Sequence, residues 1–222
     1  HSNDALKPLP SKAIWVATQD RIFQGKLDIQ SLRAITGQIE ANLVIFVEDP
    51  FARLWVEAIL RQAGNVAVDH IQVHGMEGDG TAVSVNRYHR LDPSSRVPSV
   101  CLIDGDSKQQ EDASAGVFRL PGQSPEAYVF DEVMAAWDAI GGKLSVALLQ
   151  RFENSEHVKQ VCQSVRTTNR DSHLLFAQVG ERLGLITEAT VATAFTNIWA
   201  QAYPDIVSQM LAPFAERIPR ER

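Results

Sequence analysis

Acidic side chains follow two short apolar segments of the sequence, and together they could hold a divalent metal ion. Glu48 comes directly after the run 43–47, and Asp104 and Asp106 come directly after the run 100–103. Both runs are continuously apolar, rich in β-branched residues and short, which predicts strands that are buried on both faces. Because the carboxyl ends of parallel strands meet at one edge of a sheet, we expect the three carboxylates to converge there.

The chemistry that such a cluster supports is metal-assisted hydrolysis. Clustered carboxylates repel one another unless a cation neutralises them, and hard oxygen ligands favour magnesium, manganese or calcium. A metal held by only a few carboxylates keeps water or phosphate oxygens in its other positions, which suits phosphoryl transfer. Seen alone, an Asp-Gly-Asp sequence is more often a simple turn. The second acidic strand end, at Glu48, is what favours a metal site.

The elements that would position these residues alternate between strands and helices. Apolar residues recur at three- and four-residue spacing from Phe51 to Ile59, which predicts an amphipathic helix capped by Asp49. After Glu126 only helical spacing recurs. Further strands are predicted over 66–73 and 116–120, a short helix over 82–89, and later helices near 143–152, 155–166, 172–183, 187–202 and 204–217. This order predicts an α/β fold with a mostly parallel four-stranded sheet flanked by helices and a C-terminal all-helical extension.

Composition and charge narrow the class of protein. The 222 residues are 45% hydrophobic and 22% charged, as in an ordinary globular protein. The formal net charge of -6 argues against a chain that holds nucleic acid through its own basic surface. No apolar run approaches the length of a membrane span, and Cys101 and Cys162 read as free buried thiols, so we expect a cytoplasmic protein. No Gly-x-x-x-x-Gly-Lys-Ser/Thr run is present, so the sequence predicts no nucleotide hydrolysis.

Several motifs resemble the Toprim domain that primases, type IA and type II topoisomerases and OLD-family (overcoming lysogenization defect) nucleases share. Residues 44–48 look like its first motif, a strand that ends in glutamate, and residues 101–106 look like its Asp-x-Asp motif. Two further segments, 120–126 and 170–176, are similar to the OLD branch. The resemblance spans roughly residues 40–200. It implies a lead-in or linker with a short helix over 1–40, a Toprim catalytic domain over 41–140 and a helical subdomain over 141–222.

The resemblance also implies roles for particular residues. Glu48 would be a metal ligand or general base, and Asp104 and Asp106 would be ligands of one or two Mg²⁺ or Mn²⁺ ions. Many Toprim domains carry a second acidic residue four positions after the glutamate, where this chain has Ala52. The candidates for a second metal are therefore Asp49 and Glu126, for which helix capping and a surface position are the simpler interpretations. Charge on the scissile phosphate would be stabilised by Arg170 or by Lys159, and His173 would orient a catalytic group.

Three functions remain open at this point. The first is an endonuclease domain that nicks or cleaves DNA, in a longer protein whose ABC-type ATPase domain could bring copies together and which could act in phage defence. The second is cleavage of RNA, such as tRNA, by the same site. The third is a non-catalytic regulatory or assembly module that keeps the fold, which Ala52 and the negative net charge favour. Topoisomerase activity is not expected, because no tyrosine lies in a recognisable strand-cleaving context.

Overall fold

The computed structural model describes residues 15–17, 22–24, 41–76, 78–93 and 95–221. The chain divides into two compact units, His1–Asn42 and Leu43–Arg222. In the first unit, β1 (Trp15–Ala17) and β2 (Ile22–Gln24) pair antiparallel. The sequence pattern does not predict this pair, and the short helix expected within residues 1–40 lies outside the described residues.

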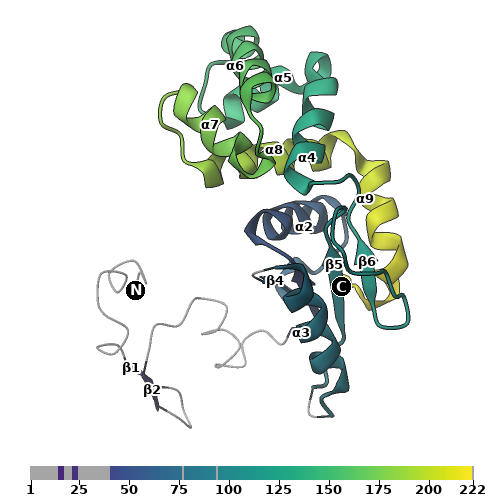
Figure 1. The fold of residues 1–222 in the computed structure, drawn as a ribbon. Coiled ribbons are helices and arrows are strands. Elements are labelled where there is room, and N and C mark those ends of the chain that lie inside the picture. Colours follow the sequence, from purple (N-terminus) through teal and green to yellow (C-terminus); the bar gives the residue numbers. More distant parts are fainter. Residues whose placement is uncertain (1–14, 18–21, 25–40, 77, 94, 222) are drawn as a thin grey trace. The chain divides into compact units, whose positions relative to one another are not determined.

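A four-stranded parallel sheet forms the centre of the second unit (Figure 1). Its strand order is β4-β3-β5-β6. The strands are β3 (Leu43–Val47), β4 (Ile71–Gly75), β5 (Ser99–Ile103) and β6 (Val117–Arg119). The predicted parallel sheet is confirmed, although β4 begins later than predicted because the preceding residues, Val68–His70, form a 3-10 turn.

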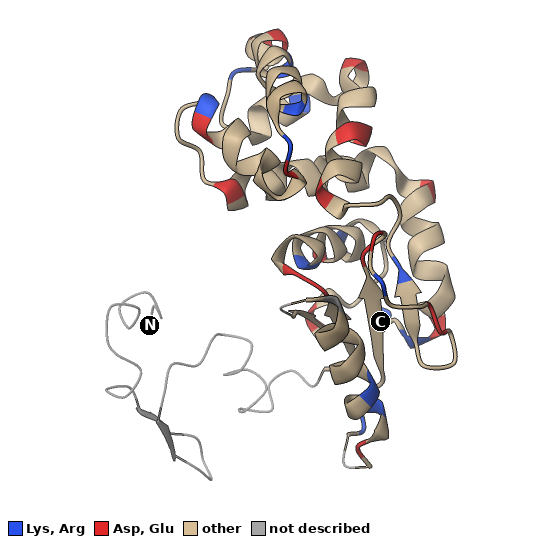
Figure 2. Ribbon diagram, in the orientation of Figure 1, with Lys and Arg blue, Asp and Glu red and all other residues tan. Residues whose placement is uncertain are grey.

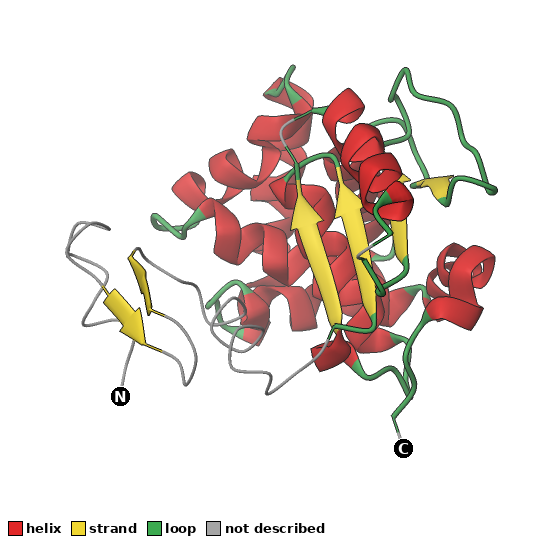
Figure 3. Ribbon diagram, turned by 90° about the horizontal axis from the view of Figure 1, so that it is seen from below, coloured by secondary structure: helices red, strands yellow, loops and turns green. Residues whose placement is uncertain are grey.

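Helices cover both faces of the sheet, as seen in Figure 3. Alternate residues of a strand point to opposite faces, so a strand buried on both sides is apolar throughout. Leu43, Ile45 and Val47 of β3 belong to the larger core, with α2 (Pro50–Gln62), whereas Val44 and Phe46 belong to a smaller core, with Ala82 of α3 (Asp79–Leu91). The structure therefore has α3 on one face and α2 on the other.

The remaining helices form the predicted C-terminal extension. They are α4 (Pro125–Ala135), α5 (Trp137–Ala147), α6 (Ser155–Thr168), α7 (Leu175–Arg182), α8 (Glu188–Ala202) and α9 (Pro204–Leu211), with 3-10 turns η4 (Phe152–Asn154), η5 (Ser172–Leu174) and η6 (Ala212–Arg217).

The extension packs on the sheet domain through α2. The ring centroids of Trp55 on α2 and Trp199 on α8 lie 5.0 Å apart in an edge-to-face contact, and both rings are fully buried. Trp137 is also buried, so these three tryptophans are core residues. Cys101 and Cys162 are buried free thiols, as predicted. One hydrophobic cluster runs from β3 through the extension, so the division near residue 140 into two subdomains stays a prediction. Among the described residues, no helix combines the length and apolar character needed to cross a membrane.

The connections of the sheet reverse direction at one place. From β3 the chain runs through α2 to β4 at one edge, whereas from β5 it runs to β6 at the other edge. The two neighbouring strands β3 and β5 therefore have connections that leave in opposite directions. Ligands of open parallel sheets bind outside the carboxyl ends of strands at such a switch point. Glu48 follows β3 there, and Asp104 follows β5.

Candidate metal centre

Four carboxylates lie within electrostatic range of Asp104 at this switch point. Asp104 is only 7% exposed, and its Oδ1 has no hydrogen-bond partner among the described residues. Burial is the largest cause that raises the pKa of Asp104 to about 8, and the charges of Asp49, Glu48, Glu126 and Asp106 contribute to the same rise in that order. The predicted convergence of acidic residues from separate strands is thus present, and it includes both candidates for a second metal. Their roles as metal ligands remain predictions.

Three of the surrounding side chains form a compact group that could hold a cation. One ligand atom each of Asp49, Glu126 and His173 lie within 4.8 Å of one another. Glu126 is 3% exposed, so the simpler interpretation as a surface residue is wrong for it. Nδ1 of His173 donates a hydrogen bond to Oε1 of Glu126 over 2.7 Å. This contact leaves Nε2 of the imidazole for a ligand or substrate, the tautomer that metal-binding histidines commonly adopt.

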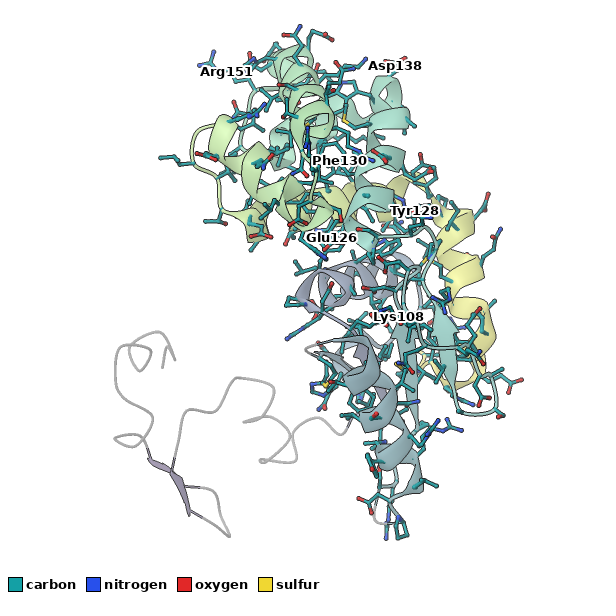
Figure 4. The ribbon with its side chains drawn as sticks, viewed as in Figure 1. Lys108, Glu126, Tyr128, Phe130, Asp138 and Arg151 are labelled. Carbon is teal, nitrogen blue, oxygen red and sulfur yellow. The ribbon has the colours of Figure 1, made fainter. Side chains whose placement is uncertain are left out.

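Local capping interactions fix the acidic residues at the ends of their elements. Oδ1 of Asp49 accepts a hydrogen bond from the backbone N–H of Ala52 over 2.7 Å, which caps α2 as predicted. Ser124 caps α4, and its hydroxyl donates to Oε2 of Glu126 over 2.9 Å. The start of α4, with Glu126, is labelled in Figure 4.

Aromatic packing beneath the site brings His173 to the acidic residues. The rings of Phe51 on α2 and Phe176 on α7 stack with centroids 4.9 Å apart, and Phe130 on α4 lies 6.1 Å from Phe176. Phe51 is two residues from Asp49, and Phe176 is three residues from His173. Packing between the first turns of these helices therefore sets the relative positions of residues that are far apart in sequence.

The Asp104 loop packs tightly against a second loop. A Cβ atom on Gly105 would lie 1.6 Å from the carbonyl oxygen of Gly122 and 2.9 Å from that of Gln123. The lack of a side chain at Gly105 permits this close approach of the two backbones. Gly122 has a positive φ of 82°, which suits glycine at this turn.

Gly105→Ala is therefore expected to destabilise the protein by about 1–3 kcal/mol, because the two loops must separate to accommodate the methyl group. Urea unfolding monitored by circular dichroism measures this change. Gly80→Ala is the matched control, because its Cβ would meet only Gln109 Nε2 at 3.8 Å and alanine favours a helix. Equal stability of the two variants would contradict the inferred close packing.

The effect of Glu126 on the pKa of His173 can also be tested. The hydrogen bond and charge of Glu126 raise the pKa of His173, with smaller contributions from Asp171 and Asp49. Glu126→Gln is expected to lower the pKa of His173, because it removes the largest cause, and Asp171→Asn is expected to lower it less. NMR titration of the imidazole resonances in metal-free protein measures both effects. A larger decrease in Asp171→Asn would show that the contact with Glu126 does not govern this histidine.

The two cations that the sequence analysis considered lie in different surroundings. Arg170 is exposed and lies three residues before His173. Lys159 on α6 forms an ion pair with Asp138 on α5, over 3.7 Å. The predicted role of Arg170 in stabilising a phosphate remains a proposal, and the structure gives Lys159 a partner within the helical extension instead.

One residue of this region was missed by the sequence analysis. The guanidinium of Arg119, at the end of β6, donates hydrogen bonds to the backbone carbonyls of Asp104, Gly105, Ser107 and Gln109. The available signal was that Arg119 is the one charged residue in the predicted strand 116–120. Figure 2 shows where acidic and basic residues lie along the ribbon.

The fold and the acidic edge define this unit as an α/β domain with a candidate divalent-metal centre. No protein-family model and no curated protein matches the sequence. The structure is similar to the C-terminal region of the Burkholderia pseudomallei OLD protein, with 15% identity, a TM-score of 0.41, and coverage of 79% of this chain and 98% of that chain. Two structures of the C-terminal region of the Xanthomonas campestris pv. campestris OLD protein are also similar, each with 16% identity and a TM-score of 0.36. They cover 78% of this chain and 97% and 96% of theirs. These similar structures are regions of OLD proteins, and the function proposed below rests on the side-chain geometry of this chain.

Proposed function

We propose that this chain is a metal-dependent nuclease domain that hydrolyses phosphodiester bonds in DNA. The observation that carries the proposal is the buried Asp104, which has a carboxylate oxygen without a hydrogen-bond partner among the described residues and four further carboxylates around it. Ionised carboxylates are costly to bury together unless a cation neutralises them. A divalent cation at the switch point would remove this cost.

The residues divide by exposure in a way that suits catalysis. Asp104, Glu48 and Glu126 are buried and would hold Mg²⁺ or Mn²⁺, whereas Asp106 and His173 are exposed where substrate would arrive. The donor set fits these ions, since it is mainly hard carboxylate oxygen with one imidazole, and one or two ions could be held. When bound, the metal would supply an activated water and stabilise charge on the phosphate.

The chain's own residues would handle the proton and the phosphate. Glu48 would bind the metal or accept the proton from the attacking water, and Asp49 would help to hold a second ion. His173 would orient the water or the leaving oxygen, because its Nδ1 is engaged by Glu126 and its other nitrogen can donate or accept. Arg170, on the segment that carries His173, would stabilise negative charge on the scissile phosphate.

DNA would be delivered with the help of a longer protein. The net charge of -6 gives this chain little general attraction for nucleic acid. We propose that an ABC-type ATPase domain in the same polypeptide supplies basic surface and also the contacts for a homo-oligomer. The similar structures are each the C-terminal region of an OLD protein.

A plasmid-nicking assay tests the proposal directly. Purified protein with Mn²⁺ or Mg²⁺ is expected to convert supercoiled plasmid to nicked or linear forms, and EDTA is expected to stop the reaction. Labelled tRNA and duplex DNA of equal concentration, assayed in parallel, separate DNA from RNA cleavage. Asp138→Asn is a matched control, because this exposed carboxylate on α5 lies outside the cluster and should leave the rate unchanged (Figure 4). Intact plasmid and intact tRNA with both metals would favour the non-catalytic module.

A further inference from the structure

One arginine, Arg119, holds the Asp104 loop through hydrogen bonds to backbone carbonyls. Nη1 of Arg119 lies 2.8 Å from the carbonyl oxygen of Asp104, 3.0 Å from that of Gly105 and 3.0 Å from that of Ser107. Nη2 donates to the carbonyl of Gln109. The planar guanidinium thus gathers four carbonyls of a six-residue stretch onto one rigid group.

The position of Arg119 in the sheet explains why it can reach the loop. Arg119 is the last residue of β6 and pairs in register with Ile103, the last residue of β5. The residues that follow Ile103 therefore leave the sheet directly beside Arg119. The backbone N–H of Arg119 also donates to Oε1 of Glu111 over 3.1 Å, which holds the far end of the same loop.

The contacts act on the backbone and not on the charge of the site. Each of the four hydrogen bonds ends on a carbonyl oxygen, and the charges that act on the Asp104 carboxyl are those of other carboxylates. When the backbone carbonyl of a residue is held in place, the direction of that residue's side chain is restricted as well. Asp104 and Asp106 both belong to the stretch that Arg119 holds.

We propose that Arg119 is a positioning residue that sets the geometry of Asp104 and Asp106 for a divalent metal. The inference rests on the function proposed above, since it assumes that these aspartates bind Mg²⁺ or Mn²⁺. Residues that orient metal ligands without touching the metal typically change metal affinity by about 10- to 100-fold when they are removed. Arg119 never contacts the metal or the substrate in this role.

Arg90 offers a matched control for the test. Its guanidinium also donates to two backbone carbonyls, Ser99 over 3.2 Å and Ser114 over 3.0 Å. Ser99 is the first residue of β5, at the opposite end of the strand from Asp104, and Ser114 lies in the segment before β6. Loss of either arginine removes hydrogen bonds to carbonyls, but only loss of Arg119 should affect the metal centre.

Two measurements test the proposal. Titration calorimetry gives the affinity for Mn²⁺, and hydrogen exchange of the metal-free protein reports how firmly the loop is held. For Arg119→Ala we expect the Kd for Mn²⁺ to rise about 10- to 100-fold. Amide exchange over residues 104–109 should also accelerate, whereas Arg90→Ala should keep both within about twofold of the wild type. Arg119→Lys retains the charge but not the planar fork, and it is expected to weaken binding in the same direction. Should Arg119→Ala not fold, Arg119→Lys and Arg119→Gln provide the same comparison.

The outcomes separate the two proposals. Wild-type affinity for Mn²⁺ in a folded Arg119 variant would overturn the positioning role, whether or not the loop exchanges faster. Equal losses of affinity in the Arg119 and Arg90 variants would also overturn it, because they would indicate a general loss of stability. Absence of Mn²⁺ binding by the wild-type protein would instead overturn the proposed metal centre, and the positioning role would fall with it.

Discussion

Asp104→Asn is expected to lower the rate of Mn²⁺-dependent phosphodiester cleavage by about a thousandfold or more. A bound metal contributes several kcal/mol of charge stabilisation in the transition state, and each 1.4 kcal/mol corresponds to about a factor of ten in rate. Asparagine matches the shape of aspartate but offers the metal no negative charge. The plasmid assay, run with saturating Mn²⁺, measures the rate.

The same substitution is expected to stabilise the metal-free protein, which separates a catalytic defect from a folding defect. Asp104 is buried among carboxylates, so removing its charge relieves repulsion and desolvation. We expect the midpoint of urea unfolding at pH 8 in EDTA to rise in Asp104→Asn and to stay unchanged in Asp138→Asn. A variant that loses activity and also stability would indicate that Asp104 is a structural residue.

The stability of the metal-free protein is expected to fall as the pH rises from about 4 to about 8. The pKa of Asp104 is raised from 3.8 to about 8 in the folded protein, so the folded state binds this proton more tightly than the unfolded state does. The stability that the protonated carboxyl contributes is therefore fully present below its unfolded pKa and is lost as the pH passes through the folded pKa. A pKa difference of one corresponds to about 1.4 kcal/mol, so the loss should reach several kcal/mol.

Divalent metal should reverse this loss. Metal ligands must be deprotonated, so protons compete with Mn²⁺ and the stabilisation by the metal should grow between pH 5.5 and pH 8. Urea unfolding at these two pH values, with EDTA or with Mn²⁺, measures both effects. Asp104→Asn should flatten the pH dependence in EDTA. A wild-type protein whose metal-free stability rises across this range, relative to Asp104→Asn, would show that the Asp104 carboxyl is not perturbed as described.

Two buried strands and their acidic ends could be predicted from the sequence alone. The continuous apolar runs before Glu48 and Asp104 are characteristic of parallel strands covered on both faces, and parallel pairing brings their carboxyl ends to one edge. Asp49 followed by proline predicts the cap of α2, because both residues act locally.

Tertiary structure alone decided which distant candidate residues come into contact with one another. Glu126 and His173 are 47 positions apart, and no spacing in the sequence predicts that their side chains form a hydrogen bond. Their meeting depends on the packing of Phe51 and Phe130 against Phe176. The role of Arg119 depends in the same way on the register of β6 against β5. Local patterns encode how a segment folds and where it ends, whereas the contacts between segments follow from side-chain packing across the whole core, which no short stretch of sequence contains.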